Sequence, residues 1–404
     1  MNLTTYCKKC VYPSSTVNLA FDNGVCTSCN TFEKFNLMTE EDWQKRKNLF
    51  KELVDQIKKN NKSNYDCIIG VSGGKDSYYQ AHVATEYGLK PLLVTYDGNN
   101  YLPEGIYNRD RMKKVFNADH IIFGPSEKVL IKLNRMGFKK MGDMNWQNHC
   151  GLMTVPMKAA VMYKVPIVIW GEIAWDISGM YDPSDFVEYS ARARLEHAMR
   201  GYEEKDFLSD EENLTRKDLT WTRYPSDEEI LKVGVRGIYL GNYFKWNPNS
   251  HVKLVKEKYG WIESKKGFQR TYRKASNLDD KYENGTHDLL KFIKFGYGRA
   301  SDHASKDIRD GYITREKGVE YVKNLDHVIP NDLYEWLEYV NMSEDEFWEV
   351  SDSFRSHKVW WIENRKWFKN NLWGIPSSYG EVRLSKIQID EFNKRQENFI
   401  KNIF

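Results

Sequence analysis

Short apolar runs alternate with helical patterns through the middle of the chain. Four runs of strand character are separated by segments in which apolar residues recur with the period of a helix. The strand candidates are Cys67–Val71, Pro91–Tyr96, His120–Phe123 and Pro166–Trp170, and the helical candidates are Ser77–Tyr87, Ile106–Phe116 and Thr154–Tyr163. This alternation predicts an α/β fold with a doubly wound parallel sheet, because parallel strands need crossover helices on both faces.

The flanking segments divide the chain into modules. Glu40–Asn60 is an amphipathic helix that ends in a polar linker, and residues 237–244 are a fifth strand candidate. The charged stretch 178–224, helical in pattern as in Glu188–Met199, is interpreted as an insertion or lid. We therefore expect a small N-terminal module at 1–36, a helix and linker at 37–64, a nucleotide domain at 65–310 with the insertion around 178–224, and a helical, Trp-rich C-terminal module at 311–404.

The first strand candidate runs directly into a helix through Ser-Gly-Gly-Lys-Asp-Ser at positions 72–77. A helix N-terminus offers free N–H groups and a dipole that favours anions, and glycines let the backbone approach an oxygen-rich ligand. Lys75 adds a positive charge, whereas Asp76 would repel a phosphate unless it binds a metal ion or orders the loop. The run is neither the Gly-x-x-x-x-Gly-Lys-Ser/Thr loop nor the Gly-x-Gly-x-x-Gly fingerprint. It predicts a phosphate site of another kind, and an ordinary strand-to-helix turn is the alternative.

Two carboxylates follow later strands of the predicted sheet. Ligands of such sheets bind at the carboxyl ends of strands, which makes Asp97 and Glu172 candidates. Asp97 could bind ribose or a metal ion, and it could equally cap a turn with Gly98. Glu172 is a candidate magnesium ligand or general base. The alternative is that it is a solvent-exposed residue at the end of a strand.

Cysteines occur as two pairs near the N-terminus. The two Cys-x-x-Cys knuckles are Cys7 with Cys10 and Cys26 with Cys29, and an Asn23-Gly24 turn between them suggests a hairpin. This spacing is typical of a four-thiolate zinc site, which would supply the folding energy of so small a module. An iron–sulfur cluster is the minor alternative.

Basic side chains gather again near position 300. Lys294, Arg299, His303 and Arg309 lie close together among glycines, which suits phosphate or carboxylate capture as well as a solvated basic face. The loop at 143–151, with His149 and Cys150, is polar and aromatic and is a candidate pocket lining.

Composition narrows the function classes. The net charge of +3 is too small to indicate a nucleic-acid partner. Val165–Trp170 is the strongest apolar run and is too short to cross a bilayer, so no membrane association is expected. The first residues lack the basic region and following apolar stretch that are typical of a signal peptide. A cytoplasmic location is therefore expected.

The six-residue run at 72–77 resembles the pyrophosphate loop (PP-loop) of the ATP pyrophosphatases, which cleave ATP between the α and β phosphates. Further features make the chain resemble the N-acetyl sugar amidotransferases of bacterial surface-polysaccharide and nonulosonic-acid pathways, those of pseudaminic and legionaminic acid among them. They are the cysteine pairs with Tyr12-Pro13, the stretches 149–156 and 239–243, and the stretches 294–299 and 308–311.

The resemblance implies a reaction and its site. ATP would adenylate the oxygen of an acetamido group on a sugar, and ammonia would replace AMP to give an acetamidino group. Mg²⁺, Zn²⁺ and a separate glutaminase subunit, often with a cyclase-like partner, are implied as well. The implied phosphate ligands are Ser72, Gly73, Gly74, Lys75 and Ser77, with Asp76 ordering the loop or magnesium and with Lys294 and Arg299 neutralising phosphate charge.

Two other functions share parts of this pattern. A tRNA-modifying PP-loop enzyme, either a thiolase or a ligase, would have the same loop and some have zinc knuckles. The low net charge and the shortage of further cysteines disfavour it. A zinc-knuckle adaptor with an inactive loop is the second alternative, which the intact motif disfavours.

Overall fold

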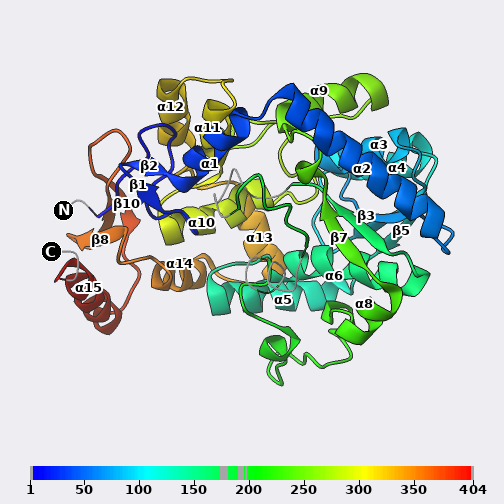
Figure 1. The fold of residues 1–404 in the computed structure, drawn as a ribbon. Helices are drawn as coiled ribbons and strands as arrows, with labels where there is room; N and C mark the ends of the chain where they lie inside the picture. Colours follow the sequence, from blue (N-terminus) through cyan, green and yellow to red (C-terminus); the bar gives the residue numbers. More distant parts are fainter. Residues whose placement is uncertain (1–2, 173–180, 190–194, 196–197, 402–404) are drawn as a thin grey trace.

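A five-stranded parallel sheet organises one half of the molecule, on the right in Figure 1. The computed structural model describes residues 3–172, 181–189, 195 and 198–401. Its strands are β3 (Cys67–Gly70), β4 (Pro91–Tyr96), β5 (Asp119–Phe123), β6 (Ile167–Trp170) and β7 (Arg236–Tyr239), in the order β5-β4-β3-β6-β7. The strand order runs outward from β3 in both directions, so the end of β3 lies at the switch point where ligands bind in such sheets.

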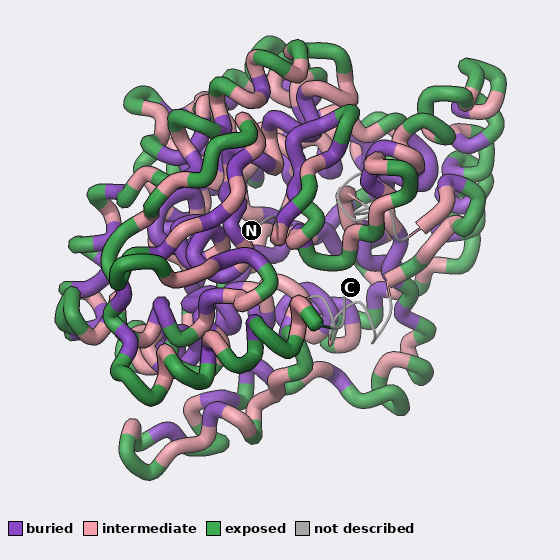
Figure 2. Tube along the Cα trace, turned by 90° about the vertical axis from the view of Figure 1, so that its left-hand side faces the viewer, coloured by how far each residue is buried: buried purple, intermediate pink, exposed green. Residues whose placement is uncertain are grey.

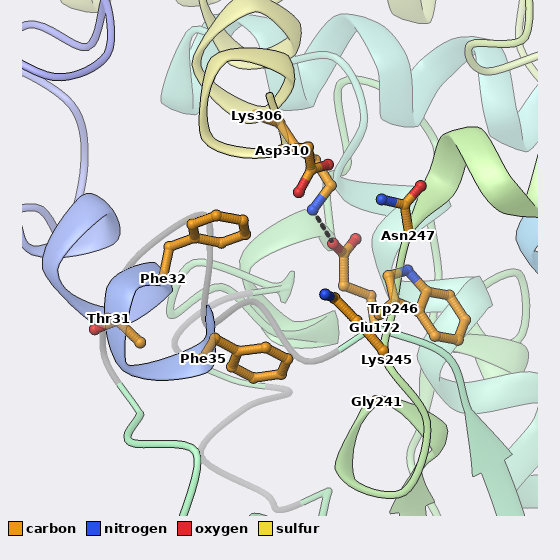
Figure 3. Close-up of a pocket in the computed structure, with 10 residues that line it drawn as sticks. All are labelled: Thr31, Phe32, Phe35, Glu172, Gly241, Lys245, Trp246, Asn247, Lys306 and Asp310. Carbon is orange, nitrogen blue, oxygen red and sulfur yellow. Dashed lines mark ion pairs between the residues drawn. The ribbon is translucent and has the colours of Figure 1, made fainter. Parts of the chain in front are cut away.

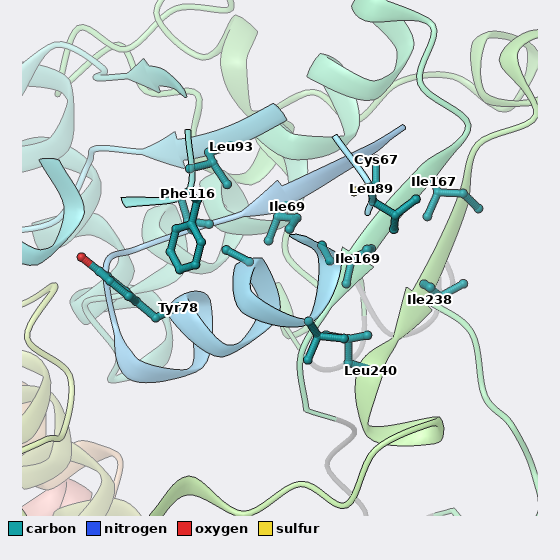
Figure 4. Close-up of a cluster of buried hydrophobic side chains, with 14 of the residues drawn as sticks. Cys67, Ile69, Tyr78, Leu89, Leu93, Phe116, Ile167, Ile169, Ile238 and Leu240 are labelled. Atoms are coloured by element: carbon teal, nitrogen blue, oxygen red, sulfur yellow. The ribbon is translucent and has the colours of Figure 1, made fainter. Parts of the chain in front are cut away.

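Alternating side chains of the strands enter two separate cores. Ile69, Leu93 and Ile169 pack on one face against α2, α3, α4 and α9, and Figure 4 shows part of this cluster. Ile68 and Val168 face α5 and α6 on the other side. The helices are α2 (Glu40–Asn60), α3 (Lys75–Glu86), α4 (Pro103–Val115), α5 (Glu127–Met141), α6 (Trp146–Tyr163), α8 (Asp227–Val233) and α9 (Pro248–Tyr259). The predicted doubly wound parallel sheet is confirmed; α5 was not predicted, and the fifth strand ends at Tyr239 before the 3₁₀ turn η4 (Leu240–Asn242).

The N-terminal module packs against the C-terminal half of the chain. It consists of β1 (Phe21–Asp22), β2 (Val25–Cys26) and α1 (Thr27–Asn36), with the predicted turn at Asn23-Gly24. Arg315 donates hydrogen bonds to the carbonyls of Cys7 and Cys10, which fixes the module to the helix α12 (Arg315–Leu325).

The C-terminal half contains helices and a second, smaller sheet. The helical elements are the π-helical turn η5 (Glu283–His287), α10 (Asp288–Phe295), α11 (Arg299–Arg309), α12 (Arg315–Leu325), α13 (Asp332–Val340), α14 (Glu344–Ser353) and α15 (Lys386–Lys401). The expectation that the Trp-rich stretch is also helical is wrong there, because β8 (Trp360–Glu363), β9 (Lys366–Lys369) and β10 (Ser377–Glu381) form an antiparallel sheet. Asn364 and Arg365 both have positive φ, as a two-residue hairpin turn requires.

The insertion is described only in part. Its described residues include the short 3₁₀ turns η2 (Glu204–Phe207) and η3 (Thr220–Thr222) and the π-helical positions Leu195 and Ala198, while most of the predicted helix Glu188–Met199 lies outside the described residues. Phe207, Leu219 and Trp221 are buried in the core on the α6 side of the sheet. The described part of the insertion is therefore packed onto the sheet domain.

Buried residues form continuous stretches in the interior, and the exposed ones lie mostly on outer helices and loops (Figure 2). Among the described residues, none of the helices combines the length and the apolar character that a membrane crossing requires.

Candidate functional site

The loop between β3 and α3 adopts a conformation that requires glycine. Gly73 has φ +81°, and a Cβ at this position would lie 2.6 Å from the backbone nitrogen of Arg109. Ser77 Oγ accepts a hydrogen bond from Ser72 N at 3.0 Å, and Trp261 Nε1 donates to the carbonyl of Gly73 at 2.9 Å. These contacts from three parts of the chain hold the loop in one shape at the first turn of α3, where an anion is favoured.

Asp76 and Lys75 are the charged members of the loop. Lys75 Nζ lies 2.8 Å from Asp76 Oδ2, and His251 Nδ1 lies 2.9 Å from Asp76 Oδ1. Burial alone would raise the pKa of Asp76, but the Lys75 ammonium and the His251 ring outweigh it and hold this pKa below its ordinary value. Asp76 is therefore a carboxylate, the kind of ligand that magnesium prefers.

A cavity of about 580 Å³ opens in front of the loop, and we call it the main cavity. Its lining contains seven Lys or Arg residues against four Asp or Glu residues. The cations are Lys75, Arg273, Lys274, Lys291, Arg299, Lys306 and Arg309, and the carboxylates are Asp76, Glu172, Glu263 and Asp302. The excess of positive charge suits a ligand with several negative charges.

One face of α11 supplies a wall of this cavity. Arg299, Asp302, His303, Lys306 and Arg309 follow the spacing of a single helical face, and all five line the cavity. The cations of this stretch do not lie on the expected glycine-rich loop, because Gly296 ends α10 with positive φ and α11 begins at Arg299. His303 is uncharged, because burial and then the neighbouring Arg273 lower its pKa far below the ordinary value.

Two cations of the main cavity, Arg299 and Lys291, are paired with neighbouring carboxylates. Arg299 Nη2 lies 3.0 Å from Glu283 Oε1, and its Nε also pairs with Asp288. Lys291 pairs with Asp302. Such pairing fixes the direction of each cation and leaves only part of its charge to a ligand.

Glu172 lies between the main cavity and a smaller one of about 30 Å³ (Figure 3). Its carboxylate points toward Lys306, and Glu172 Oε1 lies 3.8 Å from Lys306 Nζ. Phe32 and Phe35 of the N-terminal module line the far side of the small cavity. Glu172 and Asp76 both line the main cavity, so the structure brings together two of the predicted carboxylates.

Lys294 and Asp97 have other surroundings. Lys294 does not line the main cavity; its Nζ contacts the carbonyl of Met141, and burial lowers its pKa to about 7. Asp97 Oδ1 accepts a hydrogen bond from Arg109 Nη1 at 2.8 Å. The backbone of Arg109 lies close to Gly73, so this arginine links Asp97 to the loop.

The predicted polar loop at 143–151 is largely the first part of α6. Asn145 Nδ2 donates to Glu283, and Asn148 Nδ2 donates to Asp280 at 3.1 Å. His149 is 6.4 Å from His287 between ring centroids. Asn145 thus supports Glu283, which pairs with Arg299, and residues 143–151 are not among those that line the main cavity.

Several residues at the site had no signal in the sequence. His251, Trp261 and Arg109 reach the loop from distant segments, and no local pattern indicates such contacts. Asp279 also lies at the loop: burial raises its pKa to about 6, although a hydrogen bond with Ser72 opposes the rise. The adjacent carboxylates Asp279 and Asp280 are the one feature that could have drawn attention to this region.

The four cysteines of the N-terminal module form one buried cluster. The Sγ atoms of Cys10 and Cys26 are 3.7 Å apart, and those of Cys7 and Cys29 are 3.9 Å apart. A tetrahedral zinc ion with Zn–S bonds of about 2.3 Å separates its sulfurs by about 3.8 Å. The cluster therefore fits zinc, which the cysteine spacing predicted.

Comparisons with known proteins add a family match. Residues 261–372 match the model of a family described as LPS biosynthesis protein WbpG-like, C-terminal domain. This region contains α10 and α11 and thus Lys291, Arg299, Lys306 and Arg309 of the main cavity. A stretch of 119 residues is 30% identical to an uncharacterized protein of Methanocaldococcus jannaschii. It covers 29% of this chain and 41% of that protein, so the chain spans about two-fifths of the curated relative.

Two solved structures are also similar. One is an NH3-dependent NAD synthetase from Campylobacter jejuni in complex with nitrate, at 16% identity and a TM-score of 0.27, over 48% of this chain and 92% of that chain. The other is an NMN synthetase from Francisella tularensis, at 13% identity and a TM-score of 0.27, over 54% of this chain and 95% of that chain. At these identities and TM-scores neither likeness bears on the chemistry of this chain.

Proposed function

We propose that this chain is an ATP-dependent amidotransferase that converts an acetamido group of a sugar to an acetamidino group, with release of pyrophosphate and AMP. The observation that carries the proposal is the position of the loop at 72–77. Lys75 and Asp76 open into a cavity of about 580 Å³ whose other wall is the cationic face of α11. A cavity of this size is within the range of small-molecule sites and suits a nucleotide beside a second substrate.

The first step would activate the amide. The acetamido oxygen forms a bond to the α-phosphorus of ATP, and the bond from this phosphorus to the bridging oxygen breaks, so that pyrophosphate leaves. Gly73, Gly74, Lys75 and the hydroxyls of Ser72 and Ser77 hold the departing pyrophosphate. Magnesium would neutralise phosphate charge beside Asp76, with Glu172 as the second carboxylate of the cavity.

The second step would replace oxygen by nitrogen. Ammonia forms a bond to the activated carbon, the carbon–oxygen bond breaks, and AMP leaves with the former amide oxygen while the nitrogen loses a proton. The wall formed by α11 contributes Arg299, whose charge is directed by Glu283 and Asp288, to the phosphate groups. Lys294 is not part of this proposal, because it lies outside the main cavity.

The nitrogen would come from a separate glutaminase subunit, often accompanied by a cyclase-like subunit. Glutamine hydrolysis needs an accessible thiolate nucleophile. Four of the six cysteines form the metal cluster, and Cys67 and Cys150 are fully buried. Burial raises the pKa of the Cys67 thiol above the ordinary range, which is the opposite of activation.

The choice of a sugar acceptor is supported by the family match. The matched region, 261–372, is described by the name of a lipopolysaccharide biosynthesis protein and supplies most of the cations of the main cavity. A surface-glycan precursor with an acetamido group is the corresponding acceptor class.

The proposal is tested by product analysis. Purified protein is incubated with ATP, Mg²⁺, ammonium and a panel of free and nucleotide-linked acetamido sugars. We expect AMP and pyrophosphate only with a matching sugar, and a product that is lighter by the difference between oxygen and NH. Formation of AMP only when tRNA is present would instead favour the tRNA-modifying function.

A further inference from the structure

We infer that Tyr12 is a positioning residue of the main cavity and that metal binding by the four cysteines holds it in place. The inference rests on the proposed use of the cavity and extends it to the N-terminal module. The four-cysteine cluster would then be part of the substrate site and not only a means of folding a distant module.

The backbone of Tyr12 is hydrogen-bonded to two residues of the cysteine cluster. The carbonyl of Tyr12 accepts a hydrogen bond from Cys7 N at 2.9 Å, and its N–H donates to Cys10 Sγ at 3.5 Å. Arg315 of α12 holds the carbonyls of Cys7 and Cys10 at 3.1 Å each. The backbone of Tyr12 is thus fixed by the same turn that presents two of the sulfurs.

The side chain of Tyr12 contacts the main cavity. Its side chain is 1% exposed and lines the main cavity. The hydroxyl donates to Asp302 Oδ1 at 3.2 Å, and Asp302 in turn pairs with Lys291. The Arg309 guanidinium lies 5.7 Å from the centre of the Tyr12 ring. Tyr12 therefore orients two of the cations that face the ligand.

The N-terminal module has a small apolar cluster to keep it folded. Its apolar cluster consists of the four cysteines, Tyr12 and a few partly buried neighbours, together with Tyr297 from the turn before α11. So small a cluster supplies little burial energy, and metal binding is then the main source of its stability. Loss of the ion would release Tyr12 from Asp302 and Arg309 while the sheet domain stays folded.

The test compares two tyrosines of the same module. Tyr12→Phe removes the hydroxyl that reaches Asp302, whereas Tyr6→Phe removes a hydroxyl that donates to the carbonyl of Asn370 away from the main cavity. Binding of Mg²⁺-pyrophosphate and of Mg²⁺-ATP is measured by calorimetry, with zinc content determined for each protein. We expect roughly three- to tenfold weaker binding for Tyr12→Phe at full zinc content, and unchanged binding for Tyr6→Phe.

A second measurement tests the role of the metal. In the wild type, removal of zinc from the four cysteines by chelation is expected to weaken the binding of Mg²⁺-pyrophosphate by at least about tenfold. Added Zn²⁺ should restore this binding. In Tyr12→Ala the same treatment should have a smaller effect, because the coupling residue is already absent. The inference about Tyr12 would be overturned if zinc removal weakened pyrophosphate binding equally in the wild type and in Tyr12→Ala, or if Tyr12→Phe bound as tightly as the wild type. Neither result would contradict the proposed function. A wild type that binds neither pyrophosphate nor ATP would overturn the proposed function as well.

Discussion

His251 donates a hydrogen bond from Nδ1 to Asp76 Oδ1 at 2.9 Å, although 175 positions separate the two residues. The imidazole also stacks on Tyr79, with ring centroids 3.8 Å apart. One carboxylate oxygen of Asp76 is thus held by α9 and the other by Lys75. This arrangement fixes Asp76 as an ionised and oriented group at the edge of the main cavity.

Asp76→Asn should reduce pyrophosphate release by roughly 100-fold or more, because the amide cannot replace a carboxylate beside magnesium and phosphate. Zinc content and the unfolding transition should stay close to those of the wild type. Asp55→Asn, which also removes one charge but lies on the exposed side of α2, is the matched control. Wild-type turnover by Asp76→Asn would show that the loop is not the phosphate site.

His251→Phe keeps an aromatic ring on Tyr79 and removes the hydrogen bond to Asp76. Because His251 is one of the groups that lower the pKa of Asp76, this pKa should rise in the variant. Activity requires the ionised carboxylate, so the acidic limb of the pH profile should move to higher pH. His82→Phe is the control, since His82 contacts Tyr259 and not the loop. Identical acidic limbs in all three proteins would contradict a positioning role of His251.

Gly73→Ala should abolish ATP binding, whereas Gly311→Ala should not. Both positions have positive φ, +81° and +76°, and the backbone strain of an alanine is about 1 kcal/mol at each. Only at Gly73 does the added Cβ also meet backbone atoms, those of Arg109, while nothing lies within 4 Å at Gly311. Equilibrium unfolding and ATP binding separate the two effects. Equal binding by both variants would mean that the close approach to Arg109 has no role.

Lys294→Met should stabilise the protein at neutral pH. Lys294 has a pKa of about 7 in the folded protein, below the value of an unfolded lysine, because it is buried. Between these two pKa values the unfolded chain binds the additional proton, so the wild type gains stability as the pH rises through this window.

Lys294→Met lacks this pH dependence of stability. We expect its free energy of unfolding to exceed that of the wild type by on the order of 1–3 kcal/mol at pH 7, and the difference to disappear toward pH 10. Urea unfolding at several pH values measures the difference, with Lys51→Met at an exposed position of α2 as the control. Pyrophosphate release should persist in Lys294→Met. A large loss of turnover would return Lys294 to the catalytic site.

Local patterns were sufficient for the sheet, the loop and the cysteine cluster. The strands β3, β4 and β6 are apolar runs in a chain that alternates strands with helices, and the cysteine pairs have the spacing of one tetrahedral ion. The Trp-rich hairpin was missed because its turn, Asn364-Arg365, lacks the glycine that usually marks such turns.

The site was harder to predict because its parts meet only through tertiary structure. Arg299 and Arg309 were singled out from their charge, but their common direction depends on α11 beginning at Arg299. Tyr12 lines the main cavity from the N-terminal module and His251 contacts the loop from α9, and no sequence period connects either residue to the loop. Lys294 is close in sequence to the cations of α11, but its side chain points into the interior and contacts the carbonyl of Met141.

Isotope transfer tests the proposed amide activation most directly. An acetamido sugar accepted by the protein is prepared with heavy oxygen in its carbonyl group and incubated with ATP, Mg²⁺ and ammonium. If the amide oxygen attacks the α-phosphorus, the AMP contains the heavy isotope, the pyrophosphate does not, and the sugar product has lost it. AMP without the heavy isotope, or a sugar that keeps it, would contradict activation of the acetamido group by adenylation.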